Sequence, residues 1–378
     1  SMRKVAQLGY FKIQQTPVIT PVEGTEDKVD TTVNGEEDNR NTFEFGGGYS
    51  GFEGGFLQSS YSTRNFLGRG EEFNLTARLG GRTNRYSIGF TEPWIFNRPY
   101  TLGFTLFRMD RKFMQFNQTS VGGSVVLGMP VTYFSRFLVR YSYEQTKVSG
   151  ISGFENQLNL ISLQRSNIIQ VTPSFLYDSR NHFYVPTAGT YFITSLPISH
   201  WALGSDVSYY KFFTQATYHH KAYKRSHIAL NGEFGLVRPF PGHRIPASER
   251  FFLGGAGSIR GYQIRSVSPE FGGFVYGGDT YIGLNAEYII PAGDVFQFAF
   301  FADAGRAYTL HAAQTVFQGD IVTLKTPITF DLNASVGFEL RLFVPSSPFP
   351  VRFIWSKPLN PDPWQRTQTF EFNIGPSF

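Results

Sequence analysis

The chain has 378 residues, of which 34 are lysine or arginine, 29 are aspartate or glutamate, none is cysteine and 17% are aromatic. The balance is mildly basic without a basic cluster, so we expect no nucleic-acid partner. No stretch approaches the 18 or so apolar residues of a membrane helix. Many aromatic residues at a mean hydropathy of −0.20 favour a transmembrane β-barrel, in which alternate residues contact lipid and aromatic girdles mark the interfaces.

Residues 1–40 differ from the rest of the chain, and we expect them to be the tail of an upstream domain. The stretch from Lys4 to Phe11 predicts the end of a helix, closed by Gly9, and residues 35–39 form a polar hinge. This segment is too short to bury a core of its own. Because the sequence starts at Ser1 without a signal peptide, we expect the natural N-terminus to lie further upstream.

From residue 41 onward apolar residues recur with a period of two, which predicts an all-β antiparallel barrel of about 16 strands over residues 41–378. The clearest case is 328–342, where every even position is apolar and the odd positions include Glu339 and Arg341. Such a strand presents one face to lipid and one to water. The expected strands are 42–50, 53–62, 71–81, 84–93, 100–111, 119–129, 135–147, 167–178, 189–199, 207–221, 227–237, 279–290, 295–307, 328–343, 350–358 and 368–378.

The connections alternate between tight turns and longer loops. Turn chemistry at 186–189, 291–294 and 345–348 predicts one rim, and loops such as 112–118, 148–166, 238–278 and 308–327 predict the other. In barrels of this class the short turns are periplasmic and the long loops extracellular. An even number of strands then places both termini at the periplasmic rim.

The longest of these loops contains the glycine-rich segment 254–262, with a single cation, Arg260. Glycine permits positive φ and close approach of the backbone, and a loop of this length is commonly functional or disordered. Parity places Glu287 and Asp303 on the lumenal faces of the two strands that follow. If the loop folds into the lumen, Arg260 reaches both carboxylates in charge-assisted contacts. The alternative is that both carboxylates only line a wet channel.

The first and last strands predict a barrel that closes poorly between them. Three consecutive glycines, at 46–48, weaken the interior of the first strand, and Pro376 in the last has no N–H to donate. The plainer interpretation is that the glycines mark a bend and that Pro376 lies at a frayed end.

Enzymatic interpretations find little support in the sequence. His219 and His220 are adjacent in a strand and face opposite sides, so they are a poor catalytic or metal-binding pair. No HExxH, GxSxG or Walker pattern occurs. We therefore expect no enzymatic activity, no cofactor and no metal site; a hydrolase site assembled from separate strands is the enzymatic alternative.

Several segments resemble one family in order along the chain. Ser258, Ile259, Arg260, Gly261 and Tyr262 are similar to the VRGF/Y motif in the sixth extracellular loop of the BamA family of outer-membrane assembly barrels. The resemblance extends from residue 3 to the end of the chain, and the stretch from Leu8 to Phe11 is similar to the close of the last POTRA (polypeptide-transport-associated) domain. Further matching segments are 65–70, 91–94, 178–180, 184–189, 300–305 and 370–375.

The resemblance implies an insertase of the bacterial outer membrane that folds and inserts client β-barrels. In that family the loop arginine meets lumenal carboxylates, here Glu287 and Asp303, and the seam between first and last strands serves as a lateral gate. The final residues depart from the family because they lack the polar-charged pair often found before the terminal aromatic. The positions that correspond to the gate are Glu44, Gly46, Gly47, Gly48, Glu371, Asn373, Gly375 and Phe378.

The partners implied are the lipid bilayer, unfolded client outer-membrane proteins and accessory assembly lipoproteins that dock on POTRA domains upstream of this chain. Two alternatives remain at this point. One is a related pore that secretes or translocates polypeptide, and the other is a passive diffusion channel narrowed by the long loop. An ordinary porin constriction does not require an arginine such as Arg260 on a glycine-rich loop.

Overall fold

A computed structural model describes most of the barrel and parts of the N-terminal segment. The described residues are 11–13, 18–21, 29–32, 35–37, 41–50, 54–112, 117–149, 165–183, 185–271, 274–311, 313–317, 320–324, 331–344 and 350–374. Within them, no helix is long and apolar enough to cross a membrane.

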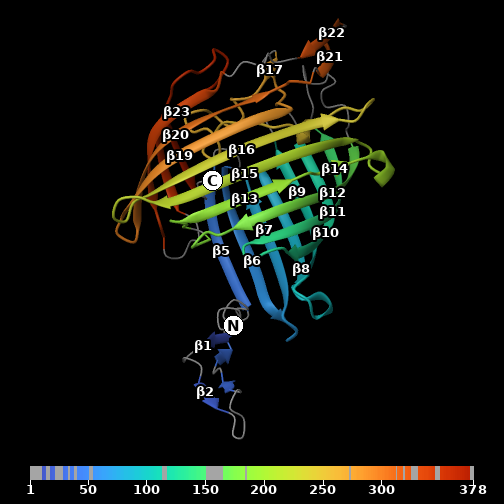
Figure 1. Ribbon diagram of the computed structural model, residues 1–378. Coiled ribbons are helices and arrows are strands. Elements are labelled where there is room, and N and C mark those ends of the chain that lie inside the picture. Colours follow the sequence, from blue (N-terminus) through green and yellow to red (C-terminus); the bar gives the residue numbers. More distant parts are fainter. Residues whose placement is uncertain are drawn as a thin grey trace.

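The main body is one closed antiparallel β-barrel (Figure 1). Its strands are β5 (Asn41–Ser50), β6 (Gly54–Phe66), β7 (Glu71–Gly80), β8 (Thr83–Glu92), β9 (Thr101–Lys112), β10 (Asn117–Pro130), β11 (Ser135–Ser149), β12 (Arg165–Asp178), β13 (Gly189–Ser195), β14 (Ile198–Ser199), β15 (Tyr209–Lys221), β16 (His227–Pro239), β19 (Thr280–Ala292), β20 (Phe296–Tyr308), β23 (Asn333–Leu342), β24 (Val351–Pro358) and β25 (Phe370–Ile374). Because β13 and β14 both lie between β12 and β15, they are two parts of one strand position. The predicted all-β barrel of about 16 strands is confirmed.

The predicted alternation decides which side chains enter the lumen. In β23 the side chains of Ser335, Glu339 and Arg341 are buried inside the barrel, whereas Val336 and Phe338 are exposed on the outer surface. A strand whose two faces differ in this way cannot slip by one residue, because the slip would exchange the two faces. Parity therefore fixes the register of the wall that carries the site.

Several predicted strand boundaries are shifted, and the start of the strand expected at 328–343 is among the largest shifts. The strand expected from 328 begins at Asn333, and Asp331 and Leu332 precede it without strand pairing, while 328–330 lie outside the described residues. The ladder between β20 and β23 ends at Gly305 and Asn333. Beyond that point the Arg306 side chain donates to the Asp331 carbonyl. This carbonyl thus accepts its bond from a side chain and not from the backbone of the neighbouring strand.

The two rims differ as the turn pattern predicts in their longest connections, although the two-residue connection 81–82 lies at the rim of the long loops. At the rim where β5 begins, here called the N-terminal rim, short connections such as 67–70 and 293–295 join the strands. At the opposite rim the longest described connection is 240–279, which joins β16 to β19. It carries three short elements of its own: η3 (Ala247–Glu249), β17 (Glu270–Phe271) and β18 (Phe274–Val275). Two further 3-10 turns, η1 (Ile95–Asn97) and η2 (Trp201–Leu203), lie in other connections, and β21 (Ala313–Phe317) pairs with β22 (Asp320–Leu324) beyond the opposite rim (Figure 1).

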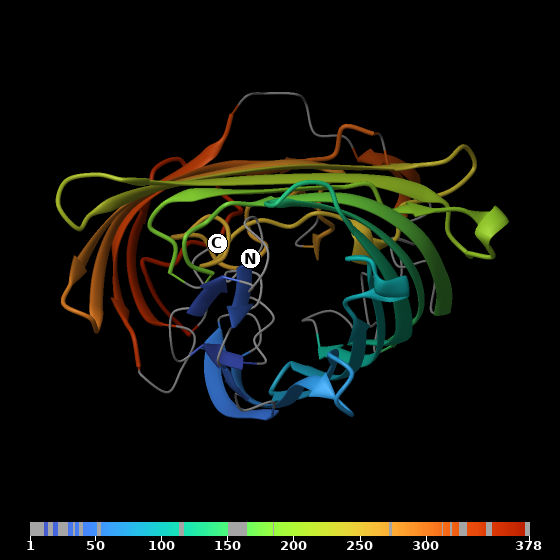
Figure 2. The ribbon, with the colours of Figure 1, turned by 60° about the horizontal axis from the view of Figure 1, so that its bottom comes forward.

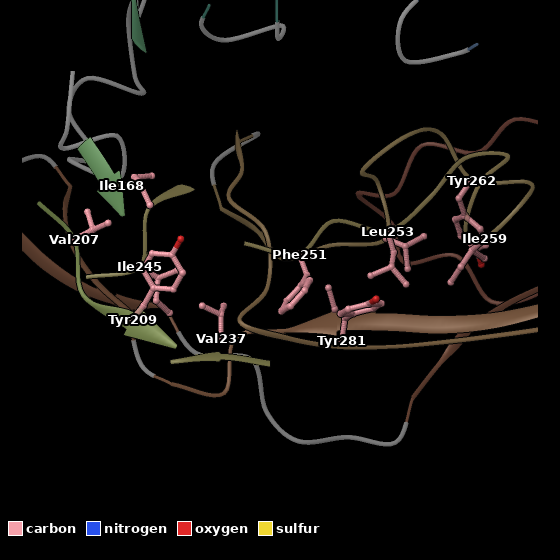
Figure 3. Packing of buried hydrophobic residues seen from close by; sticks show 12 residues of the cluster. Ile168, Val207, Tyr209, Val237, Ile245, Phe251, Leu253, Ile259, Tyr262 and Tyr281 are labelled. Carbon is pink, nitrogen blue, oxygen red and sulfur yellow. The ribbon is translucent and has the colours of Figure 1, made fainter. Parts of the chain in front are cut away.

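The loop 240–279 folds back into the barrel and supplies the core. Figure 2 shows its segments inside the ring of strands. Phe251, Leu253 and Ile259 of the loop are buried in one cluster with Val237 and Tyr281 of the wall (Figure 3). Because the apolar loop residues are removed from water when the loop lies in the lumen, burial of this cluster stabilises the folded-in loop.

The N-terminal segment forms two small ladders below the barrel in Figure 1: β1 (Phe11–Ile13) with β4 (Gly35–Glu37), and β2 (Val18–Pro21) with β3 (Val29–Thr32). The helix end expected before Phe11 lies outside the described residues. The hinge expected at 35–39 begins instead with strand β4. The assignment of residues 1–40 to a POTRA domain stays a prediction.

Candidate functional site

Backbone geometry brings Arg260 against the lumenal wall. The next residue, Gly261, has φ +90°, a region that favours glycine. A Cβ atom placed on Gly261 would lie 3.2 Å from Ser356 Oγ and 3.3 Å from Pro358, both on β24 or at its end. Glycine at this position therefore allows both the turn and the close packing of the loop on β24.

The Arg260 guanidinium is 2% exposed and contacts three carboxylates. Its Nε donates to Asp303 Oδ2 at 2.8 Å and its Nη2 to Asp303 Oδ1 at 2.7 Å. Its Nη1 donates to Glu287 Oε1 at 2.6 Å and to Glu339 Oε2 at 3.0 Å. The guanidinium carbon also lies 3.6 Å from the centre of the Phe301 ring. The structure thus brings the two predicted partners together with Arg260 and adds Glu339.

Two further arginines complete the ionic network, which we define as Arg260, Arg341, Arg352, Glu287, Asp303 and Glu339. Arg341 Nη2 donates to both oxygens of Glu287 at 2.7 Å, and its Nε donates to Glu339 Oε1 at 2.7 Å. Arg352 donates to the two oxygens of Glu339 at 2.6 and 2.9 Å. Three cations and three carboxylates make the network formally neutral, which a buried cluster requires because an uncompensated charge is costly there.

Four neighbouring strands and the loop supply the network. Glu287 comes from β19, Asp303 from β20, Glu339 and Arg341 from β23, and Arg352 from β24. Arg341 is directly opposite Arg352 in the ladder. Asp303 also accepts bonds from the Arg260 backbone N–H at 3.1 Å and from Asn285 Nδ2 at 3.0 Å. The carboxylate therefore positions the loop backbone as well as its side chain.

The other residues of the loop motif fix the loop around Arg260. Ser258 Oγ accepts a bond from Gly254 N–H at 2.8 Å, and Ile259 lies in the buried cluster. The Tyr262 hydroxyl donates to the Ala334 carbonyl at 3.2 Å. Burial raises the pKa of this hydroxyl above its ordinary value, so Tyr262 is a neutral donor at physiological pH.

Sequence reasoning missed three members of the network. Glu339 and Arg341 were placed on the lumenal face by parity but were not connected with Arg260, and Arg352 was not singled out. The sequence did contain a signal for Glu339 and Arg341, because they lie on the lumenal face of the strand that follows those of Glu287 and Asp303. For Arg352 the signal needed the register between β23 and β24, which alternation alone does not provide.

The loop is also bonded to the segment that leads into the last strand. Gln263 N–H donates to the Arg366 carbonyl at 2.8 Å, and Gln368 N–H donates to the Gly261 carbonyl at 2.8 Å. Tyr262 and Thr367 form an isolated antiparallel bridge between them. The loop motif therefore connects the ionic network to residues 366–368, two positions before β25 begins.

The seam is the contact between β25 and β5, which are neighbours in the closed strand order. β25 has 5 residues and β5 has 10. On the outer face, the Tyr49 and Phe372 rings lie 5.9 Å apart across the seam. Glu371 is buried on the lumenal side.

The remaining predicted gate residues are placed only in part. The Glu44 carboxylate accepts a bond from Ser60 at 3.3 Å, within the β5–β6 pair. Asn373 is opposite Arg352 in the β24–β25 ladder. A Cβ atom on Gly48 would lie 2.4 Å from the Phe56 ring, so this glycine also makes room for an aromatic ring of β6. Gly375 and Phe378 lie outside the described residues.

The ionic network and the bonds to residues 366–368 can hold the loop and the start of β25 in place. The described residues contain no group of three or more side chains suited to a metal ion. His219 is buried toward the lumen, whereas His220 is exposed next to Tyr218 on the other face. The two histidines diverge as the strand geometry predicts.

Comparisons with known proteins agree on the family and on the fold. The family model described as the Omp85 superfamily domain matches residues 65–378. The outer membrane protein assembly factor BamA of Neisseria meningitidis is 25% identical and covers 100% of this chain and 52% of its own length. BamA of Nitratidesulfovibrio vulgaris is 26% identical, and the match covers 100% of this chain and 46% of that protein. The chain thus spans about half the length of the curated relatives it matches.

Solved structures show the same architecture at lower identity. BamA from Haemophilus ducreyi lacking POTRA domains 1–3 superposes with a TM-score of 0.78 at 21% identity, over 100% of this chain and 77% of that one. CdiB from Acinetobacter baumannii superposes with a TM-score of 0.64 at 13% identity, over 99% of this chain and 67% of that one.

Proposed function

This chain belongs to the Omp85 superfamily and is an integral β-barrel of the outer membrane, and on that premise we propose that it folds and inserts client β-barrel proteins through the seam between β5 and β25. The observation that carries the proposal is the difference in length between the two strands. Within the described residues, β25 presents 5 residues to a β5 of 10.

Because the described part of β25 is short, we expect the seam to open more readily than the ladder between β5 and β6. Each backbone hydrogen bond contributes on the order of 1 kcal/mol net, so the free energy of opening scales with the number of paired residues. The β6 partner of β5 is paired over ten positions, from Asn41 to Ser50. β5 is therefore expected to stay on its β6 side while its other edge becomes available to an incoming strand by β-augmentation.

The clients are unfolded outer-membrane proteins, and the bilayer is the second partner. We extend the proposal to accessory assembly lipoproteins that bind POTRA domains upstream of this chain. No covalent step is assigned to the protein, since strand exchange breaks and forms only hydrogen bonds and apolar contacts. Insertion is then driven by closure of the client barrel, which removes its exposed edges.

The translocation pore and the passive channel are the alternatives. Both require a lumen that conducts, whereas the loop and its ionic network occupy part of that space. Conductance of single barrels in planar bilayers separates them from the insertase: steady conductance with polypeptide block favours translocation, and steady conductance without it favours the passive channel.

The test is a disulfide across the seam, made possible by a chain without cysteine. A cysteine at Gly46, where a Cβ atom meets nothing within 4 Å, is combined with one at Glu371 or Asn373, and the pair that bonds is assayed for folding of a client barrel in liposomes. We expect inhibition when the bond is oxidised and recovery on reduction.

The matched control is a cysteine pair at Ser60 and Thr76, which are directly opposite each other between β6 and β7. This bond joins two strands that the proposal keeps together, so client folding should not change. Full activity with a completely formed seam bond would show that the seam need not open and would overturn the proposal.

A further inference from the structure

Two buried histidines lie next to each other on the lumenal wall near the N-terminal rim, and neither belongs to the ionic network. His219 is close to the end of β15, and His227 is the first residue of β16. In the ladder His219 is opposite Ala229, so His227 is its diagonal neighbour on the same face. Diagonal neighbours are within reach of ring side chains. The two ring centres are 6.4 Å apart.

Each of these rings carries a buried nitrogen without a hydrogen-bond partner. His219 is 8% exposed and His227 is 2% exposed, and the Nδ1 atom of each has no partner. The residues opposite His219 in the two neighbouring strands, Gly189 and Ala229, have no polar side chain to offer. Buried polar atoms are normally paired. Two unpaired imidazole nitrogens from adjacent strands therefore indicate a ligand that both rings can share.

A metal ion fits the chemistry and the spacing of the pair. Imidazole is a preferred ligand of Zn²⁺, Cu²⁺ and Ni²⁺. An imidazole nitrogen binds Zn²⁺ at about 2.0–2.1 Å, so two rings on one ion have their centres roughly 5–6.5 Å apart. The observed separation of 6.4 Å lies within this range. Both rings can thus reach one ion with little movement of either strand.

We infer that His219 and His227 bind one divalent transition-metal ion of the class that prefers imidazole, such as Zn²⁺. The bound ion links β15 to β16 on the lumenal side. The expectation of no metal site weighed His219 with His220, whereas the ladder places it beside His227. This inference does not depend on the proposed insertase function.

Water completes the coordination of the ion. Glu287 lies in the same lumenal row as His219, but arginines of the ionic network engage its carboxylate. The site therefore has two protein ligands, and we expect it to bind more weakly than structural zinc sites, which have four.

Binding is measured by calorimetry with ZnCl2 on the folded full chain in detergent. The protein is prepared without a histidine tag and is freed of metal with a chelator. Wild type should show one saturable site. His219→Gln and His227→Gln should each weaken binding by more than about tenfold, since loss of a group that only orients a metal ligand already costs about 10–100-fold in affinity.

His220→Gln is the matched control, because His220 is adjacent in the sequence and is exposed on the outer face next to Tyr218. It should bind Zn²⁺ as wild type does. The inference is overturned if wild type shows no saturable site, if the double variant of His219 and His227 binds as wild type does, or if His220→Gln weakens binding as much as His219→Gln. Heat-modifiable gel mobility verifies that each variant is folded.

A second readout needs no variant. One equivalent of Cu²⁺ is added to the metal-free wild type, and the electron paramagnetic resonance spectrum reports the nitrogen atoms bound to the ion. We expect couplings from two imidazole nitrogens. Coupling from one imidazole, or from none, would contradict a site shared by His219 and His227.

Discussion

Removal of the Arg260 side chain should release the loop while the barrel stays folded. The guanidinium makes four hydrogen bonds of 2.6 to 3.0 Å to Asp303, Glu287 and Glu339. In Arg260→Met the network keeps three carboxylates but only two arginines, which leaves a net buried negative charge. Loss of one partner of a buried ion pair costs about 3–5 kcal/mol. We therefore expect the free energy of local loop opening to fall by about that amount.

Hydrogen exchange of the loop measures this change. Gln263 and Gln368 donate the backbone bonds that join the loop to residues 366–368. Their protection should fall by roughly a hundredfold to a few thousandfold, since each 1.4 kcal/mol is a factor of ten. Amides of the β6–β7 ladder serve as the internal reference, and Arg108→Met, on the outer face, is the matched control.

A second variant distinguishes charge from packing. Arg260→Met combined with Asp303→Asn returns the network to neutrality while it still lacks the arginine contacts. Neutral replacements of a buried pair are far less costly than removal of one partner, so the double variant should regain about tenfold or more of the lost protection. If the single variant keeps wild-type protection, Arg260 does not hold the loop; if the double variant is no better than the single one, charge imbalance is not the cause.

Two other predictions concern stability away from Arg260. Gly48→Val should lower the free energy of unfolding by about 1–3 kcal/mol through overpacking, because its Cβ would lie 2.4 Å from the Phe56 ring. Gly46→Val is the control, since a Cβ atom there meets no atom within 4 Å. Equal midpoints of unfolding in guanidinium chloride for the two variants would contradict this prediction. Two backbone N–H groups, at 310 and 311, donate to the Asp279 carboxylate. Asp279→Ala should therefore lower the free energy of local opening at these amides by about 1.5–3 kcal/mol, which hydrogen exchange measures as faster exchange. Unchanged exchange there would show that the carboxylate does not anchor this connection.

The sequence sufficed for the wall of the barrel because strand geometry is a local property. Alternation over 41–378 predicted the strands and the faces of Glu287 and Asp303, and the single cation in the loop identified Arg260. The start of β23 was misplaced at 328 because apolar residues continue to alternate after the ladder has ended. There the Arg306 side chain bonds the backbone of Asp331, and no periodic pattern reports such a contact.

The rest of the site depends on contacts between distant segments. Arg352 joins the network only because β24 is in register with β23 so that it is opposite Arg341. The bond between Gln263 and Arg366 links residues about a hundred positions apart. Each of these contacts arises from the closure of the barrel around the loop, and composition and spacing within one segment do not encode it.

The loop has two attachments, one to the barrel wall and one to the segment that precedes β25. Through Arg260 the loop is held by β19, β20 and β23, which lie on one side of β24 in the strand order. Through Gly261 and Gln263 it holds residues 366–368, which continue directly into β25. β25 follows directly on these residues, so we expect its position to depend in part on a loop fixed by the ionic network. Loss of Arg260 should therefore loosen the seam without touching either seam strand, and the yield of the seam disulfide should report it.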